Sequence, residues 1–207
     1  MAIVAKYNLN TNSNDSVWSF NGTDSNVTYV AGKQNWWASF NGTSSKINFW
    51  NNTNLNWWTG NFSFAFLLKL NSLGTYIRIF NKYWNTPTNN WYAFGTWHSV
   101  SSTWWLWTYD GSTSDLITWS WYFETGKRDY YVVTRNSWVI SFYKNWRKTS
   151  NSWALTSRNM SNNYDFLMWA IASEWWMNWV MADLEAYNTA IPDSLVKNKY
   201  AFYYWFM

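Results

Sequence analysis

The chain lacks cysteine, and it has only two prolines, eight glycines and one histidine among its 207 residues. Without cysteine, disulfide bonds and thiolate metal sites are excluded. Positive charge is in slight excess, with 15 lysines and arginines against 11 acidic residues, but it forms no dense run. Because nucleic-acid binders usually concentrate basic residues on one face or helix, we expect no nucleic-acid partner.

Long apolar runs are also missing. No uninterrupted segment is long enough to span a bilayer, so we expect no membrane insertion. The N-terminus, MAIVAKYNLNTN, has no basic start followed by an apolar stretch of signal-peptide length. The chain is therefore expected either to be used without the general export route or to be a domain of something longer. In the second case its place would be extracellular or surface-associated; the sequence leaves the localisation open.

Most of the sequence has the residue patterns of β-strands. The segment 61–70 places five large apolar residues on one face at a period of two: Phe62, Phe64, Phe66, Leu68 and Leu70. Its other face is too apolar for a strand fully open to water. Short connections rich in Asn, Ser and Thr predict four hairpins, which pair 38–40 with 46–49, 61–70 with 75–82, 128–136 with 137–146, and 165–173 with 178–188.

Only the C-terminal end has a helical pattern. Pro192 precedes Leu195, Val196 and Tyr200, and proline is favoured near the start of a helix. Many short strands with regular turns and no alternation with helices predict an all-β fold, an antiparallel two-sheet sandwich with a short C-terminal helix. No linker and no repeat of fixed period is visible, so we expect residues 1–207 to form a single domain.

Five segments, read in order, carry a resemblance to a known family: AKYNLN, VAGK with ASFNGTSSKINF, NFSFAFLLKLNS, RDYYVVTRNS with VISFYKN, and MADLEAYNTAIPDSL. Together they span nearly the whole chain, and it resembles the laminin G-like, concanavalin A-like lectin-glucanase jelly-roll domains. The resemblance implies two antiparallel sheets packed face to face. It also implies a sugar- or protein-binding face or rim and, in some members, a calcium ion.

Tryptophan stands where this pattern has glycine, for example in Asn145-Trp146 and Asn178-Trp179. Trp-Trp doublets also occur at 36–37, 57–58, 104–105 and 175–176, in segments that we expect to be loops. Eight glycines are few and 22 tryptophans are far above usual composition. Some bacteria read the codon UGA as glycine, and reading it as tryptophan instead would produce this exchange. We hypothesise that many of these tryptophans are glycine in the native organism.

Candidate ligand-binding residues lie near predicted loops. Aromatic rings can stack on the apolar face of a sugar, although most rings in a chain of this composition belong to the core. The carboxylates of YDGSTSDL are short oxygen ligands of the kind that calcium takes, but Asp-Gly is itself a turn signal. The lone histidine has no nearby metal-ligating partner in the sequence. The predicted set is Tyr83, Tyr92, His98, Tyr109, Asp110 and Asp115.

One pair of acids could be catalytic. Asp183 and Glu185 have the i, i+2 spacing that places two carboxyl groups on one strand face, and retaining glycosidases need such a pair. A third acid is missing, and the corresponding strand in laminin G-like domains is structural. A structural role is therefore favoured over catalysis, and no enzymatic activity is predicted.

The sequence thus predicts a non-catalytic recognition module, of the lectin or adhesion kind, that binds a carbohydrate or surface glycoconjugate at a cell or particle surface. Fold alone does not establish this, because the same sandwich hosts several functions. Two alternatives stay open: a structural or assembly protein of a phage, virus or bacterial surface layer with protein partners, and a glycoside hydrolase. Calcium is the only cofactor that the pattern suggests.

Overall fold

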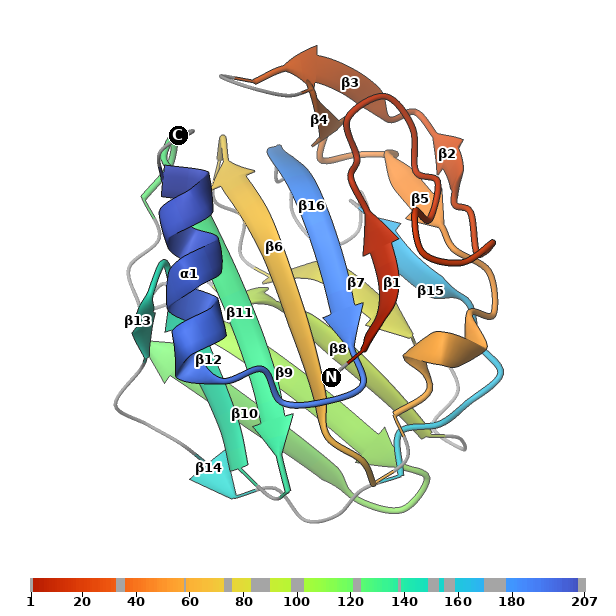
Figure 1. Ribbon diagram of the computed structural model, residues 1–207. Helices are drawn as coiled ribbons and strands as arrows, with labels where there is room; N and C mark the ends of the chain where they lie inside the picture. The colour runs from red at the N-terminus through yellow and green to blue at the C-terminus, as the bar shows by residue number, and fades with distance from the viewer. Residues whose placement is uncertain are drawn as a thin grey trace.

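Two antiparallel β-sheets lie face to face in the computed structural model of the protein (Figure 1). The structure describes residues 2–32, 36–57, 59–72, 76–82, 90–97, 103–120, 124–137, 139–148, 153–154, 159–169 and 178–204. The predicted all-β, two-sheet antiparallel sandwich is confirmed.

The first sheet, sheet A, has the strand order β13-β12-β11-β6-β16-β4-β3, with β1 added beside β16 and β14 beside β12. Its strands are β1 (Ile3–Tyr7), β3 (Thr28–Ala31), β4 (Trp36–Phe40), β6 (Phe62–Leu70), β11 (Arg128–Asn136), β12 (Val139–Lys144), β13 (Arg147–Lys148), β14 (Trp153–Ala154) and β16 (Trp179–Tyr187).

The second sheet, sheet B, has the order β10-β9-β8-β7-β15-β5-β2. Its strands are β2 (Thr23–Ser25), β5 (Lys46–Asn48), β7 (Tyr76–Lys82), β8 (Asn90–Trp97), β9 (Thr103–Asp110), β10 (Ser114–Ser120) and β15 (Phe166–Trp169). A short 3-10 helix, η1 (Thr53–Leu55), lies in the connection from β5 to β6.

The core between the sheets is built from the period-two face that the sequence predicts on 61–70. All five of its apolar residues are buried there, and Phe64 and Phe66 contact the rings of Phe80 and Phe94 from sheet B. Burial of each such ring stabilises the fold by roughly 1.5–3 kcal/mol. Strand β6 therefore contributes one face of the sandwich core along its whole length.

A C-terminal helix, α1 (Asp193–Tyr204), crosses the outer face of sheet A beside β11 and β6 (Figure 1). It begins directly after Pro192, as the sequence predicts. Val196 of the helix is buried with Ala65 and Leu67 of β6, which explains why the second face of β6 is apolar. Within the described residues, no helix has the length and apolarity needed to cross a membrane.

Three of the four predicted hairpins are wrong. Strands β11 and β12 do pair from Tyr131–Lys144 to Asn136–Val139. In contrast, the two strands of each other predicted hairpin lie in different sheets. Sheet A contains β4, β6 and β16, and sheet B contains their predicted partners β5, β7 and β15. In the first of these connections Asn41 Oδ1 accepts backbone N–H groups of Thr43 and Ser44, which turns the chain toward the other sheet. A short polar connection fits either path, so the turn residues alone do not choose between them.

The tryptophan doublets also differ from expectation. Residues 36–37 begin β4 and residues 104–105 lie within β9, so these two doublets occupy strands and not loops. Trp37 is buried, with the Arg128 guanidinium 5.1 Å from its ring centroid. Residues 58, 175 and 176 lie outside the described residues. A strand accommodates a large ring because its side chains stand clear of the backbone.

Two described tryptophans have an unfavourable feature, one in its backbone and one in its side chain. Trp50 has a φ of 52°, in the left-handed region, and its side chain is exposed. Trp179 is fully buried, and its indole N–H has no acceptor among the described residues. Glycine would avoid the Cβ conflict at Trp50. The glycine hypothesis stays a prediction, which peptide mass spectrometry of the protein from its native organism would check.

Replacing Trp50 by glycine is expected to raise the free energy of unfolding by about 1 kcal/mol, because relief of left-handed strain exceeds the entropy gained by the unfolded chain. Urea denaturation measures the change. Trp146 is the control: it is similarly exposed, but only the preceding Asn145 has a positive φ. Trp146→Gly should therefore give no stabilisation. Equal effects at both positions would contradict the argument.

Candidate functional site

Four aromatic residues of β8 and β9 gather on the outer face of sheet B, opposite the core. They form what we call the aromatic face: Trp91, Trp105, Trp107 and Tyr109. Trp91 is buried and supports the other rings, since its ring centroid lies 4.9 Å from that of Trp107 and 5.6 Å from that of Tyr109. Trp107 and Tyr109 remain partly exposed. The face thus offers solvent two adjacent rings on a rigid support.

The edge strand β10 borders these rings with polar and apolar side chains. By strand register, Ser114 lies opposite Tyr109 and Leu116 lies opposite Trp107. Thr118 follows on the same face, and all three residues are exposed. The arrangement places hydroxyl groups and an apolar side chain beside the partly exposed rings.

A buried amide lies in the same row across the sheet. Asn81 of β7 pairs with Ala93 of β8, which in turn pairs with Trp107 of β9. Asn81 is fully buried, and neither its amide nitrogen nor its amide oxygen has a partner among the described residues. Buried polar groups are nearly always hydrogen-bonded, so this side chain is an exception on the aromatic face.

The structure brings only part of the sequence-predicted set to this face. Tyr109 belongs to it. Tyr92 lies on the opposite side of β8, where it is buried in the core and its hydroxyl donates to the Leu55 carbonyl at 3.0 Å. It is therefore a core residue, and it is not accessible for contact with a ligand at the surface. Tyr83 and His98 lie outside the described residues.

Asp110 and Asp115 flank the turn between β9 and β10. Asp110 Oδ1 accepts the backbone N–H groups of Ser112 and Thr113 at 3.1 and 2.9 Å, and the Ser112 hydroxyl at 2.8 Å. It therefore closes the turn, as Asp in Asp-Gly turns commonly does. Across the described ranges, no group of three or more His, Asp or Glu side chains could hold a metal ion. The Asp110 carboxylate therefore has a structural role in the turn.

Trp107, Trp91 and Asn81 are not among the residues that the sequence predicts for a site. A signal for the rings exists in TWWLWTYD, where Trp105, Trp107 and Tyr109 alternate at period two. Asn81 has no comparable signal, because only the pairing of β7 with β8 places it beside the rings.

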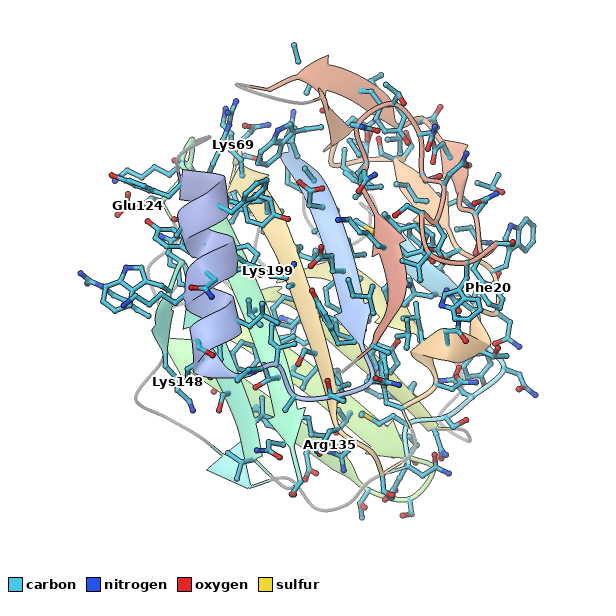
Figure 2. All side chains as sticks on the ribbon, in the orientation of Figure 1. Phe20, Lys69, Glu124, Arg135, Lys148 and Lys199 are labelled. Carbon is cyan, nitrogen blue, oxygen red and sulfur yellow. The ribbon has the colours of Figure 1, made fainter. Side chains whose placement is uncertain are left out.

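The acidic pair of β16 lies elsewhere, on the outer face of sheet A beneath α1. Glu185 is buried, and its carboxylate contacts Lys6 at 3.2 Å and Lys199 at 2.7 Å and accepts the Tyr187 hydroxyl at 2.5 Å. Lys199 projects from the side of α1 that faces β6 (Figure 2). Burial alone would raise the pKa of Glu185, but Lys199, Tyr187 and Lys6 together hold it below its usual value. This carboxylate ties α1 and β1 to the sheet.

Asp183 differs sharply from its neighbour. It sits at a β-bulge, where the register with β6 shifts between Ala182 and Glu185, and its φ of 51° is left-handed. Burial raises the pKa of Asp183 to about 6; Lys6 and Lys199 oppose this rise, and the charge of Glu185 adds to it. A raised pKa beside a second carboxylate is a feature of catalytic acids, but structural ion clusters produce it too.

Comparison with solved structures places the fold among known β-sandwich domains. The binding domain of Paraclostridial mosquitocidal protein 1 matches with a TM-score of 0.78 and 15% identity, over 98% of this chain and 52% of that one. Domain 4 of AbnA, a GH43 extracellular arabinanase from Geobacillus stearothermophilus in complex with arabinotriose, matches with a TM-score of 0.77 and 18% identity, over 95% and 97%.

A third match is the binding domain of botulinum neurotoxin serotype D, with a TM-score of 0.73 and 13% identity over 97% of this chain and 51% of that one. The chain thus spans about half the length of the mosquitocidal-protein and neurotoxin binding domains. At these identities the likeness shows the fold alone. No protein-family profile matches the sequence, and no curated protein sequence matches it either.

Proposed function

We propose that the chain is a non-catalytic domain that binds a carbohydrate of a cell or particle surface through the aromatic face of sheet B. The observation that carries this proposal is the pair of partly exposed rings, Trp107 and Tyr109, held rigidly on buried Trp91. Rigid amphipathic rings give a large contact area at low entropic cost, and they suit the apolar faces of sugar rings. We further propose that the domain belongs to the laminin G-like, concanavalin A-like group.

Two further observations support a sugar as the ligand. The exposed hydroxyl residues Ser114 and Thr118 of β10 border the aromatic face. Hydroxyl-rich ligands satisfy such donors and acceptors. Among the structural neighbours, domain 4 of the arabinanase is described in complex with arabinotriose, a neutral oligosaccharide.

Catalysis by Asp183 and Glu185 is less well supported. Glu185 is buried and already engaged by two lysines and a tyrosine hydroxyl, so neither a substrate nor water has free access to it. A glycosidase needs one carboxyl as acid and one as nucleophile or base, both facing the scissile bond. The cluster is better suited to fastening α1.

A glycan array that includes neutral plant and bacterial polysaccharides tests the proposal. We expect saturable binding to one glycan class, and Tyr109→Ala should weaken it about tenfold, which corresponds to the loss of one ring contact. Because the Asp110 carboxylate already accepts hydrogen bonds within its turn, binding should persist in the presence of a calcium chelator.

Tyr204→Ala is the matched control, because Tyr204 is an exposed tyrosine on α1. Its affinity should equal that of the unchanged protein. Absence of binding to every glycan, with and without calcium, would overturn the proposal and favour an assembly protein, which light scattering over a range of concentrations would then reveal. Reducing-sugar release that Glu185→Gln abolishes, under urea-free conditions at pH 7 in which circular dichroism shows the variant to be folded, would favour the hydrolase.

A further inference from the structure

Lys82, the last residue of β7, has an unusual environment for a lysine. Its side chain points into the sandwich, on the same side of the sheet as its cross-strand partner Tyr92, and it is fully buried. Lysine is almost never fully buried unless it is paired with an acid. Here the ammonium group contacts four oxygens that carry no formal charge, in a set that we call the oxygen cage.

The oxygens of the cage surround the lysine nitrogen from two segments of the chain, residues 51–56 and residue 162. The distances from Nζ are 2.7 Å to Asn56 Oδ1, 3.0 Å to Asn51 Oδ1, 3.1 Å to the Asn162 carbonyl and 3.4 Å to the Asn52 carbonyl. An ammonium group has three donors and no acceptor, so the cage provides an acceptor for each N–H. The cage thus joins β7 to the segments around η1 and residue 162.

The cage is held by contacts that do not involve the ammonium group. Asn162 Nδ2 donates to the Lys82 backbone carbonyl at 3.2 Å, and the Asn162 backbone N–H donates to Asn56 Oδ1 at 3.3 Å. The Asn52 side chain donates to the Tyr7 hydroxyl at 2.9 Å. These bonds orient the oxygens toward one point, so the cage should persist when the lysine side chain is shortened.

Burial lowers the pKa of Lys82 to about 8, although the charge of Asp165 opposes the shift. The group therefore stays protonated for the most part at neutral pH. Calcium prefers six to eight oxygen ligands, commonly with carboxylates among them, whereas the cage presents four neutral oxygens. Neutral carbonyl oxygens at such distances suit a monovalent cation that has lost its water.

We infer that the oxygen cage is a site for a monovalent cation, which the chain fills with its own Lys82 ammonium group. The ligand class follows from the cage: alkylammonium, ammonium or potassium ions. The site is separate from the aromatic face, and its function is to lock the η1 segment and residue 162 onto the end of β7.

Chemical rescue tests the inference. Lys82→Ala should lower the Tm by about 5–10 °C, because the cage oxygens lose their donors. n-Propylammonium chloride replaces the deleted carbons and nitrogen, and it should recover at least half of that loss relative to sodium chloride at equal ionic strength. Lys46→Ala, at an exposed lysine, is the matched control and should respond equally to both salts.

The intact protein gives a second, independent readout. Reductive methylation at neutral pH followed by peptide mapping should leave Lys82 unmodified while Lys46 reacts. Folding of Lys82→Ala only in the presence of the alkylammonium salt would also support the site. Identical melting of Lys82→Ala in both salts, or labelling of Lys82 at the rate of Lys46, would overturn the inference.

Discussion

Glu185→Gln is expected to lower the free energy of unfolding at pH 7 by about 3–5 kcal/mol, the usual effect of breaking a buried ion pair from one side. The substitution leaves the ammonium groups of Lys6 and Lys199 without their shared carboxylate, and Lys199 is a main polar link between α1 and sheet A. Equilibrium urea denaturation, followed by tryptophan fluorescence, measures the loss.

The pH dependence of this effect has a defined sign. Because the pKa of Glu185 in the folded state lies below its unfolded value, the stabilisation is present above the unfolded pKa and is lost as the pH falls through the folded one. The difference between the two proteins should therefore shrink in acid. Glu124→Gln removes an exposed carboxylate paired with Lys127 and should change stability little. Equal stability of Glu185→Gln and the unchanged protein at pH 7 would rule out the fastening role.

Asp183→Asn is expected to act in the opposite direction and to raise the free energy of unfolding at pH 7 by about 2–3 kcal/mol. The pKa of Asp183 is raised to about 6 in the folded state, chiefly by burial. Its stabilising neutral form is therefore fully present only below the unfolded pKa near 4, and that contribution is lost as the pH rises through 6. Asparagine is neutral throughout, and it also tolerates the left-handed φ of 51°.

Denaturation at pH 4 and pH 7 distinguishes this cause from a change in packing. At pH 4 the aspartate is protonated in the folded state and about half protonated in the unfolded state, so most of the difference between the two proteins should be gone. A gain of the same size at both pH values would mean that charge is not the reason. A loss at pH 7 would mean that the carboxylate has a partner that favours its ionised form.

Asp183 and Glu185 show what residue spacing can predict and what it cannot. The spacing of Asp183 and Glu185 predicts that they share a strand face, and both act on the outer side of sheet A. Their different pKa directions depend on Lys6 from β1 and Lys199 from α1, which are remote in the sequence from one another. No local pattern reveals which of two neighbouring carboxylates receives those partners.

The aromatic face likewise depends partly on a local sequence pattern and partly on the tertiary structure. The alternation in β9 places Trp105, Trp107 and Tyr109 on one side of a strand, and that much is readable from the chain. Which side faces the core depends on the opposing sheet. Tyr92 and Tyr109 lie on neighbouring strands, yet Tyr92 is buried in the core and Tyr109 is partly exposed on the outer face.

By itself the sequence determined the all-β class, the core face of β6 and the helix that begins after Pro192, because alternation and helix starts are local properties. Only the tertiary structure decided which strands pair, since a short polar connection can close a hairpin or cross between sheets at similar local cost. It likewise decided the surroundings of Asn81, Lys82 and Glu185, whose contacts join segments far apart in the chain. Burial and neighbouring charge come from the assembled fold, and they set what each polar side chain can do.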